Sequence, residues 1–344
     1  MSTGAQPGAA ALPSSTVVPV SQPVTPNRPV RRGRLFRFVA AAVVLLAVAG
    51  YLVVQYVSGG PGAPRCTVGS GDDTYRLSPE QAENAATISA VGTSRGMPER
   101  AVTIALATAL QESGLRNITH GDRDSVGLFQ QRPSQGWGTI QQIMDPVYSA
   151  GKFYQRLAEV PGYSRLPLTV AAQRVQRSGF PQAYAKHEPD AALLTAALTG
   201  RSPASLTCTI AKDARPGDPA RVRAELARAF GAGTAPDKSE GQEVTVPVRT
   251  PARAGAEARA GAEQRGWELA HWAVAHAAAF RVEQVSYAGR TWRVDGSRKG
   301  WHTDDTEAAA SGATSADAAR DTDGSGAGAQ GSGALGQVRI RLAG

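Results

Sequence analysis

An uncharged apolar run of 20 residues, from Phe38 to Val57, constrains this chain more than any other feature. At about 1.5 Å per residue, a helix of that length reaches across the roughly 30 Å hydrocarbon core of a bilayer. Five arginines lie between positions 28 and 37, whereas the next charge after the run is Arg65. The positive-inside bias therefore predicts a single-pass membrane anchor, with the N-terminus in the cytoplasm and the remaining chain outside. A cleaved secretory signal is the alternative, and it also exports the rest of the chain.

Composition divides the rest of the chain into ordered and linking parts. With 38 Gly and 22 Pro in 344 residues, much of the length is expected to be linker. The expected boundaries are a disordered cytoplasmic tail over 1–37, a transmembrane helix over 38–57, a linker over 58–65, a helical domain over 66–210, a linker with one helix over 211–263, and a small α/β module over 264–344 that contains a disordered acidic insert at 303–334.

The net charge of +8 raises the question of nucleic acid binding. The basic residues are not clustered with aromatic residues on any one segment, and no zinc-finger spacing or ribonucleoprotein motif can be read. We therefore expect no nucleic acid partner.

Two cysteines, Cys66 and Cys208, bracket the segment that is densest in apolar residues. An exported chain meets an oxidising environment, which favours a disulfide between them. In the loop-entropy description, closing so long a segment contributes roughly 4 to 5 kcal/mol. Two unpaired buried thiols are the alternative.

Helix signals dominate the segment between the cysteines. Ser78 to Gln81 supplies a capping hydroxyl, a first-turn proline and a capping-box amide, so a helix is predicted to begin there. Pro98 opens a second helix that Gly114 ends. Further helices are predicted from Asp145 onward, over 170–175 and over 191–198. The expected class of this domain is mostly α.

Glu112 is the strongest candidate for a catalytic residue. It lies in the last turn of an otherwise apolar helix, where the helix dipole and the apolar neighbours both disfavour its ionisation. Its pKa is therefore expected to be raised, so that the carboxyl group can hold a proton near neutral pH and act as a general acid. The simpler interpretation is an exposed glutamate at a helix end.

Two motifs around this glutamate resemble the lysozyme-like domain of lytic transglycosylases, over about residues 77–200. Glu112-Ser113-Gly114 is similar to the catalytic glutamate motif of that family. Gly127-Leu128-Phe129-Gln130 is similar to its Gly-Leu-Met-Gln, with Gln130 lying 18 residues after Glu112. The resemblance implies a lysozyme-like fold and peptidoglycan as the substrate.

The reaction implied by this resemblance needs one carboxyl group. Glu112 would protonate the leaving oxygen of the β-1,4 bond between N-acetylmuramic acid and N-acetylglucosamine, then accept the proton of the substrate 6-hydroxyl, leaving a 1,6-anhydromuramoyl end. No cofactor is implied, and no metal is expected because His120 has no second ligand at metal-binding spacing. The expected substrate-binding residues are Ser113, Ser125, Gln130 and Gln131, Trp137 as a sugar platform or a packing aromatic, and Tyr184.

This chain departs from the family pattern in ways that keep alternatives open. Gly121 stands where many members carry a hydroxyl residue, and VQRSGFPQAY replaces their late Ala-Tyr-Asn-x-Gly motif. Asp122 and Asp124 would supply the second carboxylate of a hydrolytic, goose-type-like muramidase, or else are solvated turn residues. A non-catalytic wall-binding or scaffold protein is the other alternative. The expected partners are peptidoglycan, the membrane and unidentified envelope proteins.

The last 80 residues resemble the end of a D-alanyl-D-alanine-carboxypeptidase-like domain found behind wall-lytic modules in actinobacteria. A helix over 267–280, a strand pair over 281–288 and 290–294, and a last strand over 338–343 are predicted. The zinc-binding histidine of that family is missing, so a non-catalytic module is expected. The high Ala, Gly and Arg content is also typical of actinobacterial proteins. The complete expectation is a mostly α lysozyme-like domain, preceded by one transmembrane helix and followed by a small α/β module.

Overall fold

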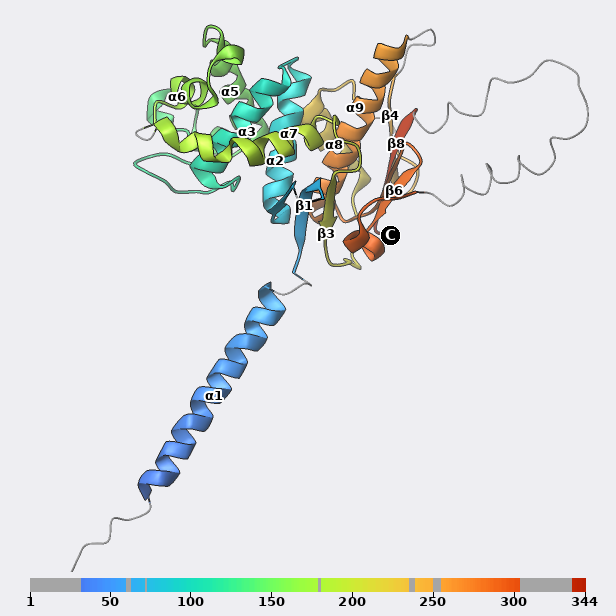
Figure 1. Cartoon of the computed structure of the whole chain (residues 1–344). Coiled ribbons are helices and arrows are strands. Elements are labelled where there is room, and N and C mark those ends of the chain that lie inside the picture. The colour runs from blue at the N-terminus through green and yellow to red at the C-terminus, as the bar shows by residue number, and fades with distance from the viewer. Residues whose placement is uncertain are drawn as a thin grey trace, which may run out of the picture. The chain divides into compact units, whose positions relative to one another are not determined.

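The computed structural model describes residues 32–59, 63–71, 73–178, 181–234, 239–249, 255–303 and 336–344. The chain divides into two compact units, Met1–Gly59 and Gly60–Gly344 (Figure 1). The expected disordered tail lies outside the described residues up to position 31, and the expected acidic insert lies outside them from position 304 onward.

The first unit contains one helix, α1 (Arg32–Gly59). Its described side chains, at positions 37–53, are exposed. Within the described part of the chain, no helix combines the length and the apolarity that crossing a membrane requires. The expectation of a transmembrane helix over 38–57 therefore has no support in the described residues.

A three-stranded antiparallel sheet joins the two ends of the helical segment. Its strands, in the order β2-β1-β3, are β1 (Arg65–Ser70), β2 (Asp73–Leu77) and β3 (Leu206–Thr209). Cys66 lies directly opposite Cys208 in the ladder between β1 and β3, and the two form the predicted disulfide. Both cysteines are buried, so the bond closes the helical segment inside its own core.

The five predicted helices are present between these strands. They are α2 (Pro79–Ser94), α3 (Glu99–Ser113), α5 (Pro146–Ala158), α6 (Leu168–Gln176) and α7 (Glu188–Leu198). The short helix α4 (Ile140–Ile143) and the 3-10 turns η1 (Pro133–Gln135), η2 (Tyr163–Arg165) and η3 (Pro181–His187) were not predicted. The predicted capping box starts α2, where Ser78 and Gln81 exchange side-chain to backbone hydrogen bonds. Helix α3 is buried from Ala101 to Leu110 and contacts α2, α5, α6 and α7, so it forms the centre of the helical part.

Gly114 ends α3 as predicted. Its φ of 64° is a left-handed conformation that glycine adopts without strain, and its N–H bonds back to the carbonyl groups of Ala109 and Leu110. The chain therefore leaves the helix one residue after Ser113, and Glu112 is held in the last turn.

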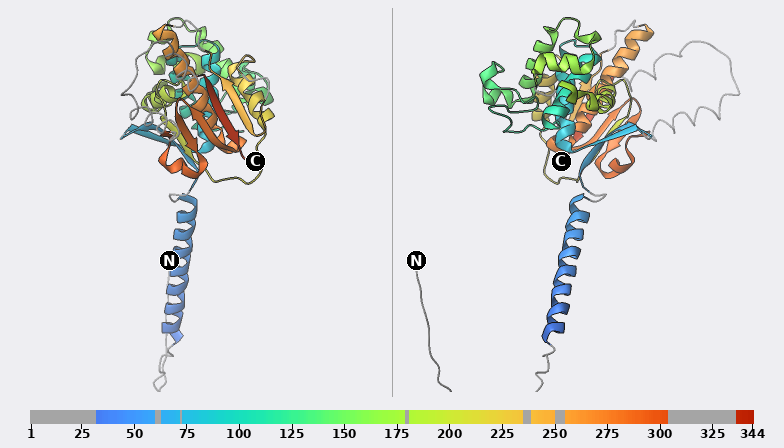
Figure 2. Two further views of the ribbon diagram at one scale, coloured as in Figure 1. Left: turned by 90° about the vertical axis from the view of Figure 1, so that its right-hand side faces the viewer. Right: turned by 60° about the vertical axis from the view of Figure 1, so that its left-hand side comes forward.

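The second sheet has five antiparallel strands in the order β4-β8-β5-β6-β7, and the left view of Figure 2 shows them side by side. They are β4 (Glu243–Pro247), β5 (Val282–Tyr287), β6 (Arg290–Arg293), β7 (His302–Thr303) and β8 (Gln337–Leu342). Helix α8 (Pro219–Phe230) precedes β4, helices α9 (Ala256–Ala275) and α10 (Ala277–Phe280) lie between β4 and β5, and the 3-10 turn η4 (Val294–Lys299) lies between β6 and β7. Alternate residues of β8 are buried, and the strand contacts α9, so the core lies between the sheet and this helix. The helix expected over 267–280 begins earlier, at Ala256, and breaks at His276.

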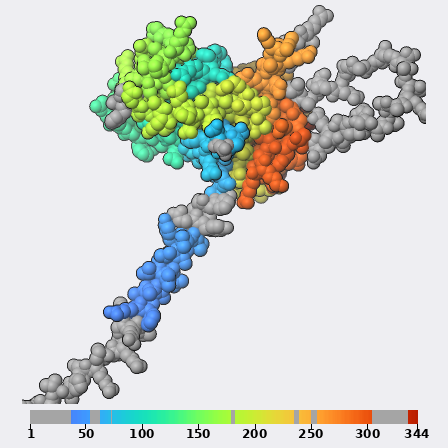
Figure 3. All heavy atoms as spheres, in the orientation of Figure 1, coloured from blue at the N-terminus to red at the C-terminus, as the bar shows by residue number. Residues whose placement is uncertain are grey.

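Helix α9 packs against the helical part as well as against its own sheet. The Thr93 hydroxyl of α2 donates to the buried Glu268 carboxylate. His271 Nδ1 donates to the carbonyl oxygen of Ala197 in α7 at 2.7 Å. The surfaces of the two parts adjoin in Figure 3. Residues expected to form two domains, 66–210 and 264–344, thus share one core within the second unit.

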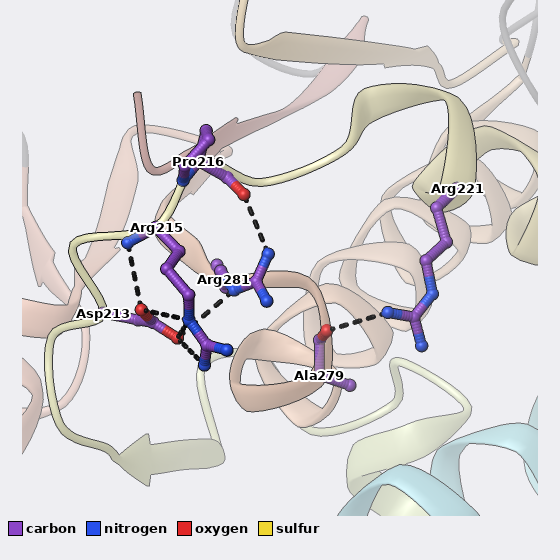
Figure 4. A network of polar contacts seen from close by, with 6 residues as sticks. All are labelled: Asp213, Arg215, Pro216, Arg221, Ala279 and Arg281. Atoms are coloured by element: carbon purple, nitrogen blue, oxygen red, sulfur yellow. Dashed lines mark hydrogen bonds and ion pairs between the residues drawn. The ribbon is translucent and has the colours of Figure 1, made fainter.

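The connection after β3 is fixed by a network of polar contacts around Asp213 (Figure 4). Its carboxylate accepts hydrogen bonds from Arg215, with Nη2 at 2.7 Å, and from Arg281 Nε at 3.2 Å. These hydrogen bonds hold the pKa of Asp213 well below its usual range. Arg281 also donates to the carbonyl oxygen of Pro216 at 2.8 Å. The segment leading to α8 is therefore tied to the start of β5.

The prediction of a mostly α lysozyme-like domain is wrong, because the described part of the chain is mixed α/β with two antiparallel sheets, one of which brackets the helical segment. The strands that were missed are β1, β2 and β3, β4 within the expected linker, and the two-residue β7. They are short, and in β1 only Cys66 and Val68 are buried. So brief an alternation does not stand out from a polar linker in the sequence.

Candidate active site

Glu112 is a partly buried carboxyl group at the C-terminal end of the central helix. Its Oε1 accepts a hydrogen bond of 2.7 Å from the Tyr184 hydroxyl. Burial raises the pKa of Glu112, and the hydrogen bond from Tyr184 opposes that rise because it stabilises the ionised form. The direction agrees with the expectation from the sequence.

Tyr184 reaches Glu112 from η3 and is itself fully buried. Burial raises the pKa of the phenol, and the neighbouring Glu112 carboxylate raises it further. The hydroxyl therefore keeps its proton at any pH at which the protein functions. It acts as a neutral donor and cannot itself serve as a base near neutral pH.

A second hydrogen bond fastens η3 to the end of α3. His187 Nε2 lies 3.2 Å from Oε1 of Gln111, and since an amide oxygen only accepts, the imidazole must donate. Burial lowers the pKa of His187, and Lys186 lowers it further. The two adjacent residues Gln111 and Glu112 are thus each joined to η3.

Gln176 anchors the loop next to the candidate site, and the sequence interpretation missed it. It is the last residue of α6, and its Nε2 donates to the carbonyl oxygen of Phe129 at 2.7 Å. A usable signal was present, because Gln176 lies four residues after the buried Ala172 and next to the buried Val175. A polar residue on the apolar face of an amphipathic helix needs a buried partner.

The loop from His120 to Gln131 lies against the end of α3. Ser113 Oγ lies within hydrogen-bonding distance of two backbone oxygens, that of Leu128 at 2.8 Å and that of Ala109 at 3.1 Å. Gln130 has a φ of 46°, a left-handed conformation that is uncommon for a residue with a side chain. Ser113 thus acts as an anchor between the helix and this loop.

Ser125, Gln130 and Gly121 form a closely packed group within the loop. The Ser125 hydroxyl lies 3.0 Å from Oε1 of Gln130 and 2.7 Å from the carbonyl oxygen of Asp122. A Cβ atom at Gly121 would lie 1.7 Å from Gln130 Oε1 and 2.4 Å from Ser125 Oγ. The space that a side chain at position 121 would need is therefore already filled, in part by the Ser125 hydroxyl.

Gln131 and Trp137, two of the predicted substrate-binding residues, are largely buried. Gln131 is 1% exposed and donates from Nε2 to the carbonyl oxygen of Ser149 at 3.0 Å. Trp137 is 6% exposed, and the Arg156 guanidinium lies 3.6 Å from the centre of its ring. Both side chains fix the loop to α5, and the Trp137 ring has little surface free for a sugar.

The two loop acids differ in their surroundings. Asp124 accepts from Arg132 Nε at 2.7 Å and from the Ser134 N–H at 2.9 Å, and these bonds hold its pKa well below its usual range. Asp122 is exposed and lies 3.9 Å from the Arg123 guanidinium. Asp124 is thus an anion already engaged in holding the loop to η1.

No group of three or more His, Cys, Asp or Glu side chains able to hold a metal ion occurs in the described residues. His271 and His276, which the sequence places five residues apart, are both fully buried and hydrogen-bonded to backbone carbonyl oxygens.

Comparisons with known proteins do not assign this arrangement to a family. No protein-family model matches the chain, and no curated protein matches it.

Proposed function

We propose that this protein is a peptidoglycan lytic transglycosylase in which Glu112 acts first as an acid and then as a base. The observation that carries the proposal is the partly buried Glu112 carboxyl group, which accepts a hydrogen bond from the neutral Tyr184 hydroxyl. Burial favours the protonated form, and the hydrogen bond favours the ionised form. A carboxyl group balanced in this way has both protonation states within reach, which an acid-then-base mechanism requires.

In the first step the Glu112 proton passes to the glycosidic oxygen as the bond between N-acetylmuramic acid and N-acetylglucosamine breaks. The carboxylate that results is stabilised by the hydrogen bond from Tyr184. In the second step this carboxylate takes the proton of the muramoyl 6-hydroxyl as that oxygen bonds to C1. Glu112 regains the proton that it gave up in the first step, no water is consumed, and a 1,6-anhydro end is left.

The state of Asp124 favours this reaction over hydrolysis. A hydrolase needs a second carboxylate as a nucleophile or as a base for water. Asp124 already accepts from Arg132 and from the Ser134 N–H, and both hydrogen bonds make it a weaker base and a weaker nucleophile. A mechanism that uses the substrate's own hydroxyl group avoids the need for this residue.

The disulfide between Cys66 and Cys208 supports an extracytoplasmic location for the proposed activity. Such bonds persist in oxidising compartments and are rare where thiols are kept reduced. Peptidoglycan lies in such a compartment, so the bond and the proposed substrate agree.

Digestion of purified sacculi by the full chain, followed by mass analysis of the released fragments, tests the proposal. We expect muropeptides with 1,6-anhydro ends from the wild type and none from Glu112→Gln. Glu159→Gln is the matched control, because Glu159 is an exposed glutamate at the end of α5. Reducing ends would show a hydrolase instead. Unchanged sacculi, or equal lysis by Glu112→Gln, would contradict Glu112 catalysis and favour a wall-binding protein.

A further inference from the structure

We propose that one end of the second sheet carries a binding site for a small aliphatic carboxylate, whose charged group is held by Arg293 and Arg341. The site is a surface hollow of about 280 Å³, called the charged hollow below, and its lining residues are Lys212, Glu283, Arg293, Val294, Asp295 and Arg341. It shares no residue with the contact between Glu112 and Tyr184. The inference therefore goes beyond the proposed glycan cleavage and is tested separately from it.

The strand register brings the two arginines to the same face of the sheet. Gln284 of β5 lies opposite Arg341 of β8 on one side and opposite Arg293 of β6 on the other. Residues directly opposite each other project to the same face, and neighbouring strands lie about 4.8 Å apart. Both arginines are exposed, and both line the charged hollow. Their guanidinium groups are thus available to one ligand over Gln284.

A chain of hydrogen bonds that begins inside the sheet orients the Arg341 guanidinium. Its Nη2 donates to Oε1 of Gln284 at 2.6 Å, and Gln284 Nε2 donates to Oγ of Ser286 at 3.0 Å. Ser286 Oγ lies 2.8 Å from Oγ1 of Thr291, and both of these hydroxyl residues are buried. A guanidinium held in this way loses less freedom when a ligand binds.

The acids of the charged hollow face Lys212, whereas the two arginines have no acidic partner. Lys212 Nζ lies 3.7 Å from Oε1 of Glu283 and 3.6 Å from Oδ2 of Asp295. Among the described residues, the Arg293 side chain has no ion pair or hydrogen bond, and the Arg341 side chain bonds only to a neutral amide. Three cations and two acids leave one net positive charge, which a ligand with a single negative charge neutralises.

A carboxylate fits this arrangement better than a phosphate dianion does. The planar guanidinium group matches the two oxygens of a carboxylate, and hydrogen bonds between charged groups are the stronger ones. A dianion would exceed the net charge of the hollow and be repelled by Glu283 and Asp295, as well as by Glu243, which lies opposite Arg341 on β4. The ligand class is therefore a monoanion.

A second hollow, of about 260 Å³, adjoins the first and indicates the rest of the ligand. The two share Lys212, Glu283 and Val294. The second is otherwise lined by Asp213, Arg281 and the apolar residues Ile210, Ala211, Ala277, Ala278 and Ala343. Asp213 and Arg281 bond to each other, and Arg281 also donates to the carbonyl oxygen of Pro216, so these two are already engaged (Figure 4). The small apolar side chains leave room for a short aliphatic group.

The test uses the full chain, with isobutyrate as the probe. Binding is followed by NMR of the Nε–H groups of ¹⁵N-labelled arginine, and the signals are assigned from their loss in Arg293→Gln and Arg341→Gln. We expect isobutyrate to shift both signals with a dissociation constant of about 1 mM, as is typical of so small a ligand. Isobutyramide has the same shape without the charge and should bind at least about tenfold more weakly.

Arg339 provides the matched control. It lies two residues before Arg341 on β8 and is equally exposed, but it lines neither hollow. Arg293→Gln and Arg341→Gln should each weaken isobutyrate binding about ten- to a hundredfold, read from the signal of the arginine that remains. Arg339→Gln should leave the binding within about twofold of the wild type. All three side chains are exposed, so unchanged melting temperatures are expected.

Absence of a shift at both signals overturns the inference, as does equal binding of isobutyramide or an equal loss in Arg339→Gln. Inorganic phosphate that binds as tightly as isobutyrate would overturn the assignment to a carboxylate. Tighter binding of N-acetylvaline than of isobutyrate would identify the carboxyl end of a peptide as the source of the group, and equal binding would identify a free acid. Glu112→Gln should bind isobutyrate as the wild type does, so a failure of the proposed glycan cleavage leaves this site unaffected.

Discussion

The hydroxyl of Tyr184 donates to Oε1 of Glu112 across 2.7 Å, although the two residues are 72 positions apart in the chain. The helix α3 carries the proposed acid, and η3 carries the donor that would stabilise it after it has lost its proton. Tyr184 is completely buried, so this donor is not shared with bulk water. The contact connects the end of α3 with η3.

Tyr184→Phe is expected to raise the pKa of Glu112, because the hydrogen bond to its ionised form is lost. Hydrogen bonds to charged groups contribute roughly 1.5 to 3 kcal/mol, so kcat for glycan cleavage should fall about ten- to a hundredfold. The acid form of Glu112 would persist to higher pH, and the alkaline limb of the pH profile would move upward. The measurement is release of anhydromuropeptides from sacculi as a function of pH.

Tyr154→Phe provides the control for this substitution. Tyr154 is also buried, and its hydroxyl donates to the backbone oxygen of Ile88 at 3.0 Å, away from Glu112. We expect it to lower the melting temperature without moving the pH profile. Equal profiles for wild type and Tyr184→Phe would show that this hydroxyl does not act on Glu112.

Gly121→Ala tests the packing between Gly121 and Gln130. The added Cβ would overlap Oε1 of Gln130, so this oxygen must move, and it can do so because it is the end of a flexible side chain. If Gln130 binds substrate, as the sequence predicts, KM for sacculi should rise about tenfold while the melting temperature changes little. Gly255→Ala is the control, because nothing lies within 4 Å of a Cβ there and its φ is −68°. An unchanged KM in Gly121→Ala would argue against a binding role for Gln130.

Local sequence signals predicted the elements whose chemistry is short-range. The capping box of α2, the stop at Gly114 and the Asp218 cap of α8 each depend on residues within one helical turn, and all are present. The disulfide was predicted from the compartment and from the two cysteines alone. Glu112 was placed correctly at a helix end, because helix phase and apolar neighbours are visible in the sequence.

The parts that could not be predicted depend on contacts between distant segments. Gln176 acquires its role only when the end of α6 meets the loop at Phe129, 47 positions earlier in the chain. The buried state of Trp137 follows from Arg156, 19 positions away on another element, lying over its ring. The strands β1 and β3 gain their hydrogen bonds from each other across the whole helical segment. The hydrophobic periodicity of a local sequence window contains no information about such pairings between distant segments.

Removal of the disulfide is expected to destabilise the second unit strongly. The bond between Cys66 and Cys208 closes a segment with a sequence separation of 142, and loss of a native disulfide typically costs about 2 to 5 kcal/mol. Denaturant unfolding of the full chain, with and without a reducing agent, measures this difference. A Cys66→Ala, Cys208→Ala double variant should match the reduced protein and no longer respond to reductant. An unchanged unfolding midpoint on reduction would show that the bond adds nothing to stability.

Acidification should weaken the interface that α9 forms with the helical part. Burial lowers the pKa of His271 and of His276 to about 4, whereas both titrate near 6.5 when unfolded. The folded protein therefore binds fewer protons than the unfolded chain between these values, and the stability contributed by each neutral imidazole is present above pH 6.5 and lost as the pH falls toward 4. Each histidine contributes at most about 1.4 kcal/mol per pH unit in this window.

The test compares unfolding free energies at pH 7 and pH 5 for the wild type and His276→Gln. Between pH 7 and pH 5 the unfolding free energy of the variant should fall less than that of the wild type. The difference should equal the contribution of one buried histidine, at most about 1.4 kcal/mol per pH unit, whatever the stability of the variant at pH 7. Glu83, Glu112 and Glu268 have raised pKa values and act in the opposite direction, but they are the same in both proteins, so they cancel in the comparison. His120→Gln is the control, because His120 is exposed. Equal losses of stability by His276→Gln and the wild type between pH 7 and pH 5 would contradict this prediction. In that case the histidine is either already protonated in the folded protein or not buried in solution, and the interface is held by its apolar contacts.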